Sequence, residues 1–291
     1  MMGRQRFSLV AILLLLAGCA ELGVRIPGMT PEQSDLITKG VSAAAKAARP
    51  ISESEEYYVG RAVAARLIGT YPLLKSRELT DYVNAVGQTV ALHSDMPDTY
   101  GGYHFAILES DEVNAFACPG GIIFLTRGML NAVQNEDELA AVLAHEVAHV
   151  NHRDGISAIT KARWTEAVAI IGTEAAKAYG PRELAQLVNI FEGSIDDVFK
   201  TLVVNGYGRS QEHEADRTAL DYLARAGYDP RALHTFVNRI MEKGQVTGGL
   251  LKTHPATSAR LDRIRDALPE TGGNPELVRF RARRFSAAVR L

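Results

Sequence analysis

The feature that most constrains this chain is the run from Ala141 to Val150, which reads His-Glu-Val-Ala-His over positions 145–149 in an apolar, alanine-rich stretch. Residues four apart lie on one face of an α-helix, so His145 and His149 can present both imidazoles to one zinc ion. Glu146 lies one step around the helix, where it is placed to touch a water molecule beside the metal. The alternative is two buried histidines bonded to backbone carbonyls, but burying two histidines and an acid is costly without a function.

The helix that carries these residues has clear start signals. Asn135, followed three residues later by Glu138, matches a capping box. Acidic residues fill the first turn, where the helix dipole favours negative charge. The apolar positions cover a broad surface, which predicts a buried helix over residues 135–150. These positions are Leu139, Val142, Leu143, Val147 and Val150.

Composition limits the class of protein. The chain has 291 residues, of which 46% are hydrophobic, so it can bury a sizeable globular core. Its net charge of -2 argues against a nucleic-acid partner. Only two cysteines are present, Cys19 and Cys118, which excludes a disulfide-stapled scaffold.

The first 19 residues have the pattern of a targeting segment. Arg4 and Arg6 precede a short apolar run over residues 9–17, which is too short for a comfortable membrane span. The ending Leu16-Ala17-Gly18-Cys19 resembles the bacterial lipobox, which implies cleavage before Cys19 and lipid attachment to it; the alternative is an ordinary secretory signal. Ala20 after the cysteine favours, by the same resemblance, the periplasmic face of the outer membrane. Residues 20–50 are expected to form a tether and an N-terminal helix.

The remaining pattern predicts an α+β fold that is mainly helical with a small sheet. Polar and apolar spacing predicts helices over residues 52–69, 76–92, 209–225, 229–243 and 257–268. Strands are expected over 103–108 and 121–126, joined by a turn-rich bridge over 114–121. Residues 155–204 are expected to be mostly helical, with the part over 190–204 either covering the site or simply packing on the core. Residues 269–291, with five arginines, are expected to be a peripheral basic tail, either solvated or in contact with lipid headgroups.

A strand just before the metal-binding helix is a plausible docking edge for an extended substrate. Backbone groups on such an edge bind a peptide regardless of its sequence. Ile122, Ile123 and Phe124, with Asn114 beside them, are therefore candidate substrate-binding residues. An internal strand of the core is an equally supported interpretation.

The third metal ligand is expected from the helix that follows. A zinc hydrolase typically takes three protein ligands and leaves one coordination position open. The segment Arg209–Asp216 offers Glu214 as a good third ligand. Glu212, His213 and Asp216 are local competitors that spacing alone does not exclude.

Taken together and in order, these motifs resemble the CAAX-prenyl-protease-type zinc metallopeptidases. That family includes membrane heat-shock proteases and periplasmic proteases of outer-membrane quality control. The resemblance covers roughly residues 52–268. It rests on Asn114–Gly121, Glu138–Ala140, the His-Glu-x-x-His motif, Gly208–Asp216, Thr253–Pro255 and Arg260.

The resemblance implies a gluzincin-type metallopeptidase domain over residues 51–268. It assigns one zinc ion per chain to His145, His149 and Glu214, with Glu146 as the catalytic base. The membrane-embedded relatives have spanning helices, whereas no segment beyond the signal is apolar enough to predict one here.

Further roles are implied around this centre. Asp216 would orient a zinc-bound histidine. His254 and Arg260 would lie near the site and stabilise the oxyanion, or His254 would cap the zinc in a resting state. Two positions depart from the family pattern, since many relatives carry histidine where this chain has Asp154, and Cys118 replaces a small or aliphatic residue.

The sequence thus predicts a lipid-anchored zinc metalloendopeptidase that cleaves misfolded or unassembled envelope proteins. One alternative is a chaperone or assembly factor that works with the outer-membrane assembly machinery and has a gated or little-used protease site. Another is a structural lipoprotein that tethers other factors, which explains Cys19 but leaves the His-Glu-x-x-His motif without a role.

Overall fold

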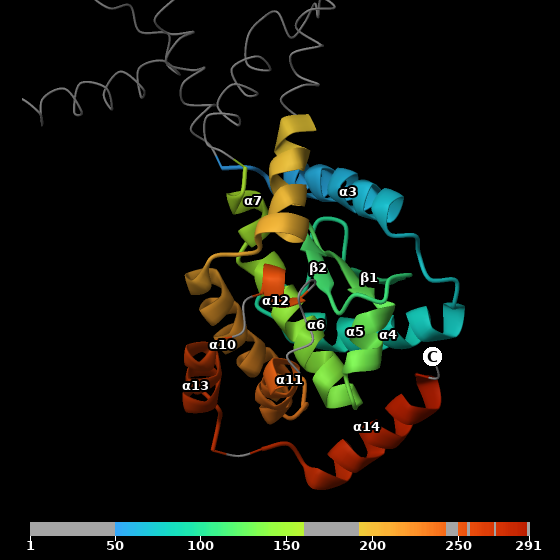
Figure 1. The fold of residues 1–291 in the computed structure, drawn as a ribbon, viewed down its shortest axis with the longest axis vertical. Coiled ribbons are helices and arrows are strands. Elements are labelled where there is room, and N and C mark those ends of the chain that lie inside the picture. The colour runs from blue at the N-terminus through green and yellow to red at the C-terminus, as the bar shows by residue number, and fades with distance from the viewer. Residues whose placement is uncertain (1–49, 160–191, 243–249, 255–256, 271, 290–291) are drawn as a thin grey trace, which may run out of the picture. The chain divides into compact units, whose positions relative to one another are not determined.

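The computed structural model describes residues 50–159, 192–242, 250–254, 257–270 and 272–289. The targeting segment, Cys19, the tether and the expected N-terminal helix lie outside these ranges, as do residues 160–191 of the long helical stretch. The chain divides into two units, and the helix that carries His145 and His149 belongs to the one made of Ser52–Ile159 and Ile195–Leu291 (Figure 1). The other unit lies almost wholly outside the described ranges.

Two helices precede the sheet, and both begin where the sequence predicts. Helix α3, Glu53–Thr70, starts with a complete capping box in which the Ser52 side chain accepts from the Glu55 amide. Helix α4, Arg77–Leu92, is capped by the Ser76 side chain. Each cap satisfies a backbone N–H that the first helical turn leaves without a partner.

The sheet has three strands in the order β1-β3-β2. Strand β1, His104–Leu108, runs parallel to β3, Ile122–Thr126, and both were predicted. Strand β2, Ala115–Cys118, pairs antiparallel with β3 and was wrongly predicted as part of a bridge. Its alanines have little strand propensity, but all four of its residues are buried, so packing decides the conformation.

The central position of β3 excludes it as a docking edge and confirms the alternative interpretation, an internal strand of the core. It is paired on one side with β1 and on the other with β2, and Ile123 and Phe124 are buried. Within the described ranges, strand β2 has a sheet neighbour on one side only. An extended peptide that pairs with the sheet at its β2 edge would lie beside residues 115–118. These residues directly follow the predicted substrate residue Asn114.

Helix α6, Glu136–Asn151, is the central element of the unit (Figure 1). Asn135 caps it as predicted, and every residue from Glu136 to Val150 is buried. The sheet strand β2 and the helices α4, α10, α11 and α14 pack around it, so its side chains are fixed from all sides. No helix among the described residues has the length and apolar character needed to cross a membrane.

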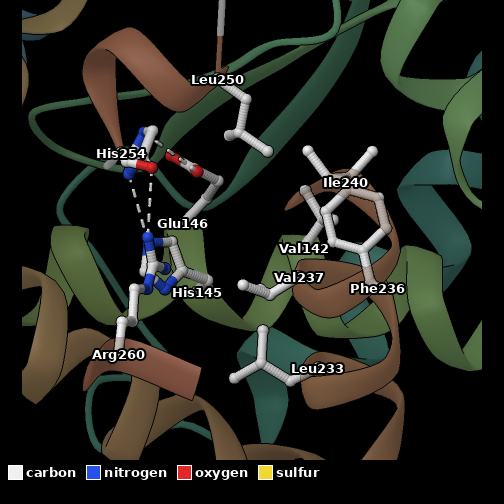
Figure 2. A pocket seen from close by; sticks show the side chains of 10 residues that line it. All are labelled: Val142, His145, Glu146, Leu233, Phe236, Val237, Ile240, Leu250, His254 and Arg260. Carbon is white, nitrogen blue, oxygen red and sulfur yellow. Dashed lines mark hydrogen bonds and ion pairs between the residues drawn. The ribbon is translucent and has the colours of Figure 1, made fainter. Parts of the chain in front are cut away.

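The elements that follow α6 bring distant residues over its metal-binding turn. They include α10, Arg209–Arg225, and α11, Arg231–Glu242. Helices α11 and α6 border an apolar pocket (Figure 2). A short π-helix, η2 at Thr201–Asn205, precedes α10 and packs against β2 and the short helix α12, Leu250–Thr253. The short helices α5, Arg127–Ala132, and α7, Asp154–Ser157, flank α6, and α13 spans Ser258–Asp266.

The expected basic tail is instead a docked helix, α14, Pro275–Ala288. It packs against α4 and α6, and Arg281 and Phe285 are buried in that contact. Arg281 donates to Asp137 at 2.7 and 3.1 Å, which neutralises a carboxylate inside the fold. The tail prediction was wrong because the partners of these arginines lie more than a hundred residues away in the sequence.

Candidate metal centre and active site

Helix α6 sets the two motif histidines on one face, one turn apart. Their Nε2 atoms lie 3.1 Å from each other and their rings are nearly perpendicular, at 88°. His145 and His149 are both buried, so their nitrogens are withdrawn from bulk water. This is the arrangement that the i, i+4 spacing predicts.

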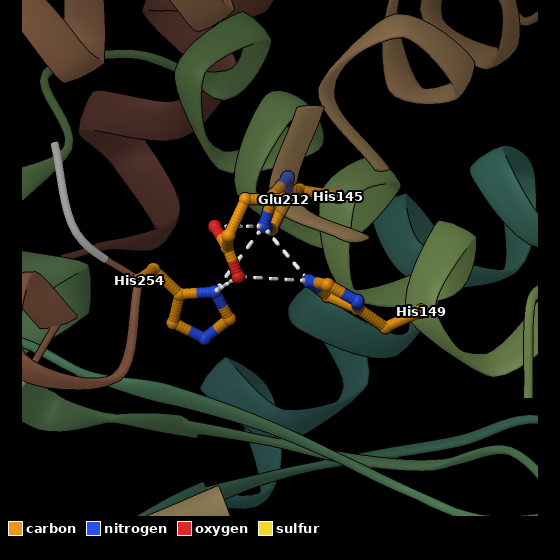
Figure 3. Close-up of side chains that lie close together, drawn as sticks. All are labelled: His145, His149, Glu212 and His254. Atoms are coloured by element: carbon orange, nitrogen blue, oxygen red, sulfur yellow. Dashed lines mark hydrogen bonds and ion pairs between the residues drawn. The ribbon is translucent and has the colours of Figure 1, made fainter. Parts of the chain in front are cut away.

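Two further side chains complete a compact cluster with these histidines (Figure 3). Glu212 of α10 lies 3.5 Å from Nε2 of each histidine, one carboxylate oxygen toward each. His254, just after α12, brings Nδ1 to 2.9 Å from Glu212 and 3.3 Å from His145 Nε2. One ligand atom from each of the four residues lies within 4.8 Å of all the others.

The donor set of this cluster fits a metal ion. Neighbouring ligands of a tetrahedral zinc lie roughly 3.3 Å apart, given bonds of about 2.0–2.1 Å, and the 3.1–3.5 Å contacts match that spacing. Burial raises the pKa of Glu212, but the surrounding histidines outweigh it and hold that pKa well below its usual value. Burial lowers the pKa of His145, yet Asp216 and Glu212 raise it overall to about 10. The cluster therefore favours bound positive charge.

The predicted ligand Glu214 is not part of this cluster. Its side chain is exposed, whereas Glu212 is buried beside the histidines. Residues two apart on a helix lie about 200° apart around the axis, so the two glutamates cannot both face α6. Asp216 shares the buried face of α10 with Glu212, since the two are four residues apart.

Each motif histidine has a carboxylate behind it. Asp216 Oδ1 lies 3.0 Å from His145 Nδ1, where the resemblance places an orienting acid. Asp154 Oδ2 lies 2.7 Å from His149 Nδ1, a role that sequence reasoning missed. Gln211 donates to the other oxygen of Asp154 at 2.7 Å. With both Nδ1 atoms held, both Nε2 atoms point into the cluster. The sequence signal that could have revealed this role of Asp154 was an acidic residue five positions after His149.

Arg260 lies next to the cluster, and its guanidinium is already engaged by neighbouring groups of the protein. Its guanidinium donates twice to Asp216, each at 2.7 Å, and its Nη1 lies 2.9 Å from Glu212. A further contact reaches the His254 carbonyl at 3.3 Å. These contacts engage the side chain with Asp216, Glu212 and the His254 carbonyl, which favours a positioning role. The expected oxyanion role of Arg260 stays a prediction.

Glu146 lies beside the cluster, with its carboxylate close to His254. The side chain is buried, and neither oxygen has a hydrogen-bond partner among the described residues. Its Oε1 lies 3.8 Å from His254 Nε2. A buried carboxylate without a donor is costly unless a water or a substrate group completes it.

Two residues outside the His-Glu-x-x-His motif also border the centre. Tyr207 stacks on the ring of His149, with centroids 4.1 Å apart and planes at 24°, and sequence reasoning did not single it out. Asn114, a predicted substrate contact, is buried and its side chain accepts from Thr253 Oγ1 at 3.3 Å and from the Ala115 amide. Asn114 therefore fastens α12, and with it His254, to the start of β2.

Comparison with known proteins places these features in a family. The model for peptidase family M48 matches residues 77–268. The beta-barrel assembly-enhancing protease of Escherichia coli (strain K12) is 28% identical over 261 residues, which cover 87% of this chain and 50% of that protein. The metalloprotease LoiP of the same organism is 28% identical over 199 residues, covering 68% of this chain and 72% of LoiP. The mitochondrial metalloendopeptidase OMA1 of Schizosaccharomyces pombe is 30% identical over 194 residues, covering 66% and 53%. The chain thus spans about half the length of several of the curated relatives that it matches.

Proposed function

Because this chain belongs to peptidase family M48, we propose that it is a zinc-dependent metalloendopeptidase. We place it on the periplasmic face of the outer membrane, anchored through a lipid on Cys19, where it cleaves misfolded or unassembled envelope proteins. The lipobox-like sequence supports the anchor. The name of the beta-barrel assembly-enhancing relatives supports an envelope substrate.

Zinc is proposed to be held by His145, His149 and Glu212, with His254 as a fourth ligand in the conformation described. Zinc bound by three protein side chains supplies a Lewis acid that activates water and polarises a carbonyl group. Four protein ligands are typical of a closed, structural zinc site. With zinc held by all four side chains, His254 would have to move aside before a substrate carbonyl could approach.

The chain's own residues would carry the remaining steps. Glu146 would accept a proton from the attacking water and deliver it to the leaving amine, which needs a carboxylate within hydrogen-bond reach of both. The edge strand β2 would hold the substrate extended through backbone hydrogen bonds. Asp154 and Asp216 would hold the rings of the ligand histidines in the orientation that points both Nε2 atoms into the cluster.

The observation that carries this proposal is the unpartnered Glu146 carboxylate next to the four-residue cluster. The test uses protein lacking residues 1–19, compared with the Glu146→Gln variant and with Glu214→Gln as a control on an exposed acid. Bound zinc and cleavage of an unfolded protein are measured together. We expect zinc in all three proteins and loss of cleavage only in Glu146→Gln. If Glu146→Gln cleaves as fast as the protein without this substitution, the mechanism is refuted. If no protein contains zinc, the result favours the structural lipoprotein that tethers other factors.

The position of His254 also favours a second candidate, a chaperone or assembly factor with a gated protease site. Its Nδ1 contacts with Glu212 and His145 place it where a substrate would need to bind. The His254→Ala variant separates the two functions. A gated protease gains cleavage activity in this variant, whereas a chaperone that does not use the site keeps its activity in suppressing aggregation and gains no cleavage.

A further inference from the structure

The chain leaves helix α6 through a residue with an unusual backbone conformation. Among the described residues, Arg153 is the only one other than glycine whose φ is positive, with a φ of 58° and a ψ of 33°. Sterics disfavour this left-handed conformation by about 5- to 30-fold for a residue with a Cβ, whereas glycine adopts it freely. Glycine is accordingly the usual residue just after the end of a helix. An arginine at this position is strained unless other contacts hold it there.

The left-handed turn at Arg153 brings Asp154 to His149. Residues five apart on a continuous helix lie about 140° apart around the axis, so a helix extended through Arg153 would turn Asp154 away from His149. Instead, the Arg153 amide donates to the Val150 carbonyl at 3.0 Å, and the chain changes direction as α7 begins. The Asp154 carboxylate then lies 2.7 Å from His149 Nδ1. This contact therefore depends on the conformation of the residue that precedes Asp154.

A buried glutamate from a distant helix contacts this strained residue. Glu56 of α3 is 5% exposed, and its Oε2 accepts from Arg153 Nε at 2.6 Å. Its Oε1 accepts from the Gly120 amide at 3.3 Å, in the turn between β2 and β3. One helical turn after Glu56, Gly60 lies so close to this turn that a Cβ on it would collide with the Pro119 carbonyl oxygen. The Glu56 carboxylate is thus held in place by the packing of α3 against the sheet.

We propose that Glu56 and Arg153 are positioning residues of the proposed metal centre. Their ion pair holds Arg153 in the left-handed conformation, and that conformation aims Asp154 at His149, so that the histidine ring is oriented toward the cluster. The inference rests on the proposed function and adds two residues that lie outside the four-residue cluster. The alternative is an ion pair that only fastens α3 to the rest of the unit. That contact would stabilise the fold without affecting the metal affinity.

The first experiment compares two double variants that differ by a single methyl group. Glu56→Gln/Arg153→Ala and Glu56→Gln/Arg153→Gly both lack the ion pair, and neither leaves a buried unpaired charge at position 56. Zinc affinity of the folded full chain in detergent is measured by competition with a chromophoric chelator. The glycine variant should bind zinc within about twofold of the unsubstituted protein, because glycine populates both conformations about equally. The alanine variant should bind about 3- to 30-fold more weakly, the upper value corresponding to the full strain.

Equal zinc affinities in the two double variants would overturn the proposal, since a contact that only fastens α3 is insensitive to the backbone preference at position 153. Ala158→Gly, added to the alanine variant, is the control for general flexibility. Ala158 lies at the end of α7 in a right-handed conformation, with a φ of −69°. Glycine at this position should not restore the affinity, and restoration would also contradict the assignment.

A measurement on metal-free protein separates failure of this inference from failure of the metal centre. The His149 ring resonances are followed by NMR in chelator-treated protein, with Asp154→Ala as the reference for a ring that has lost its partner. The alanine variant should shift toward this reference, and the glycine variant should stay near the unsubstituted protein. If no protein binds zinc but this difference appears, the positioning role stands and the metal centre fails. Equal shifts in both variants overturn the positioning role.

Discussion

Asp154, just beyond the end of α6, faces His149 in the last turn of that helix, with a carboxylate oxygen 2.7 Å from the imidazole Nδ1. The same carboxylate accepts from Gln211, the residue that precedes Glu212. Asp154 therefore links two elements of the proposed centre, the end of α6 and the start of α10. A change at this position should be felt by both.

Replacing Asp154 with alanine should weaken metal binding by about 10- to 100-fold, as is typical when the partner of a ligand histidine is lost. The measurement is zinc competition with a chromophoric chelator at fixed pH. Asp154→Asn, which keeps an acceptor oxygen for Nδ1–H, should lose less affinity. Unchanged affinity in Asp154→Ala would mean that the contact does not position His149.

The third ligand can be identified by comparing two single-residue variants of α10. Glu212→Gln should lose most of the bound zinc, because the buried carboxylate that faces both histidines becomes a weaker, neutral ligand. Glu214→Gln should keep its zinc, since that side chain is exposed. Metal analysis of both dialysed proteins decides the matter, and the reverse result would restore Glu214 as ligand.

Removing Arg281 should destabilise the fold by about 3–5 kcal/mol, because Asp137 would remain buried without its partner. Equilibrium unfolding in urea measures the loss. Arg279→Ala, on an exposed position of the same helix, is the control and should change the free energy of unfolding by no more than about 0.5 kcal/mol. An equally small effect of Arg281→Ala would show that α14 contributes little to the stability of α6.

Acid should unfold the protein partly through Asp216. Burial raises the pKa of this carboxyl, but Arg260 and His145 outweigh burial and hold the pKa at about 2, below the usual 3.8. The folded state thus binds fewer protons than the unfolded state between these values. About 2 kcal/mol of stability is present above pH ~4 and is lost as the pH falls toward 2.

The check is the free energy of unfolding measured between pH 5 and 2 in the presence of a chelator. Asp216→Asn should be less stable at pH 5 and should lose less stability on acidification than the unsubstituted protein. Parallel curves for the two proteins would assign the acid sensitivity to other carboxylates.

Local signals in the sequence account for much of the fold and for half of the site. The caps at Ser52, Ser76 and Asn135 place three helix starts because capping depends on a few adjacent residues. The spacing of His145 and His149 is likewise local. Glu212 and Glu214 differ only in helical phase, and that phase depends on packing against α6, which no local rule supplies.

The features that sequence reasoning missed depend on distant contacts. Strand β2 forms because β3 pairs with it and because the core covers it, not because its residues favour strands. Helix α14 docks because Arg281 meets Asp137, which lies 144 residues earlier. Amino-acid composition does not indicate ion pairs between distant residues. From composition alone, the arginines of this segment predict a solvated tail.

The acidic start of α6 sets an order of events during folding. Glu136, Asp137 and Glu138 are consecutive and buried, and each pairs with an arginine that is synthesised at least a hundred residues later. Arg239 comes from α11, whereas Arg281 and Arg284 come from α14. Until α11 and α14 have been synthesised, the first turn of α6 carries three carboxylates without these arginine partners, and burying them in that state is costly. A chain truncated before α14 therefore lacks two of the three arginines that neutralise the start of α6.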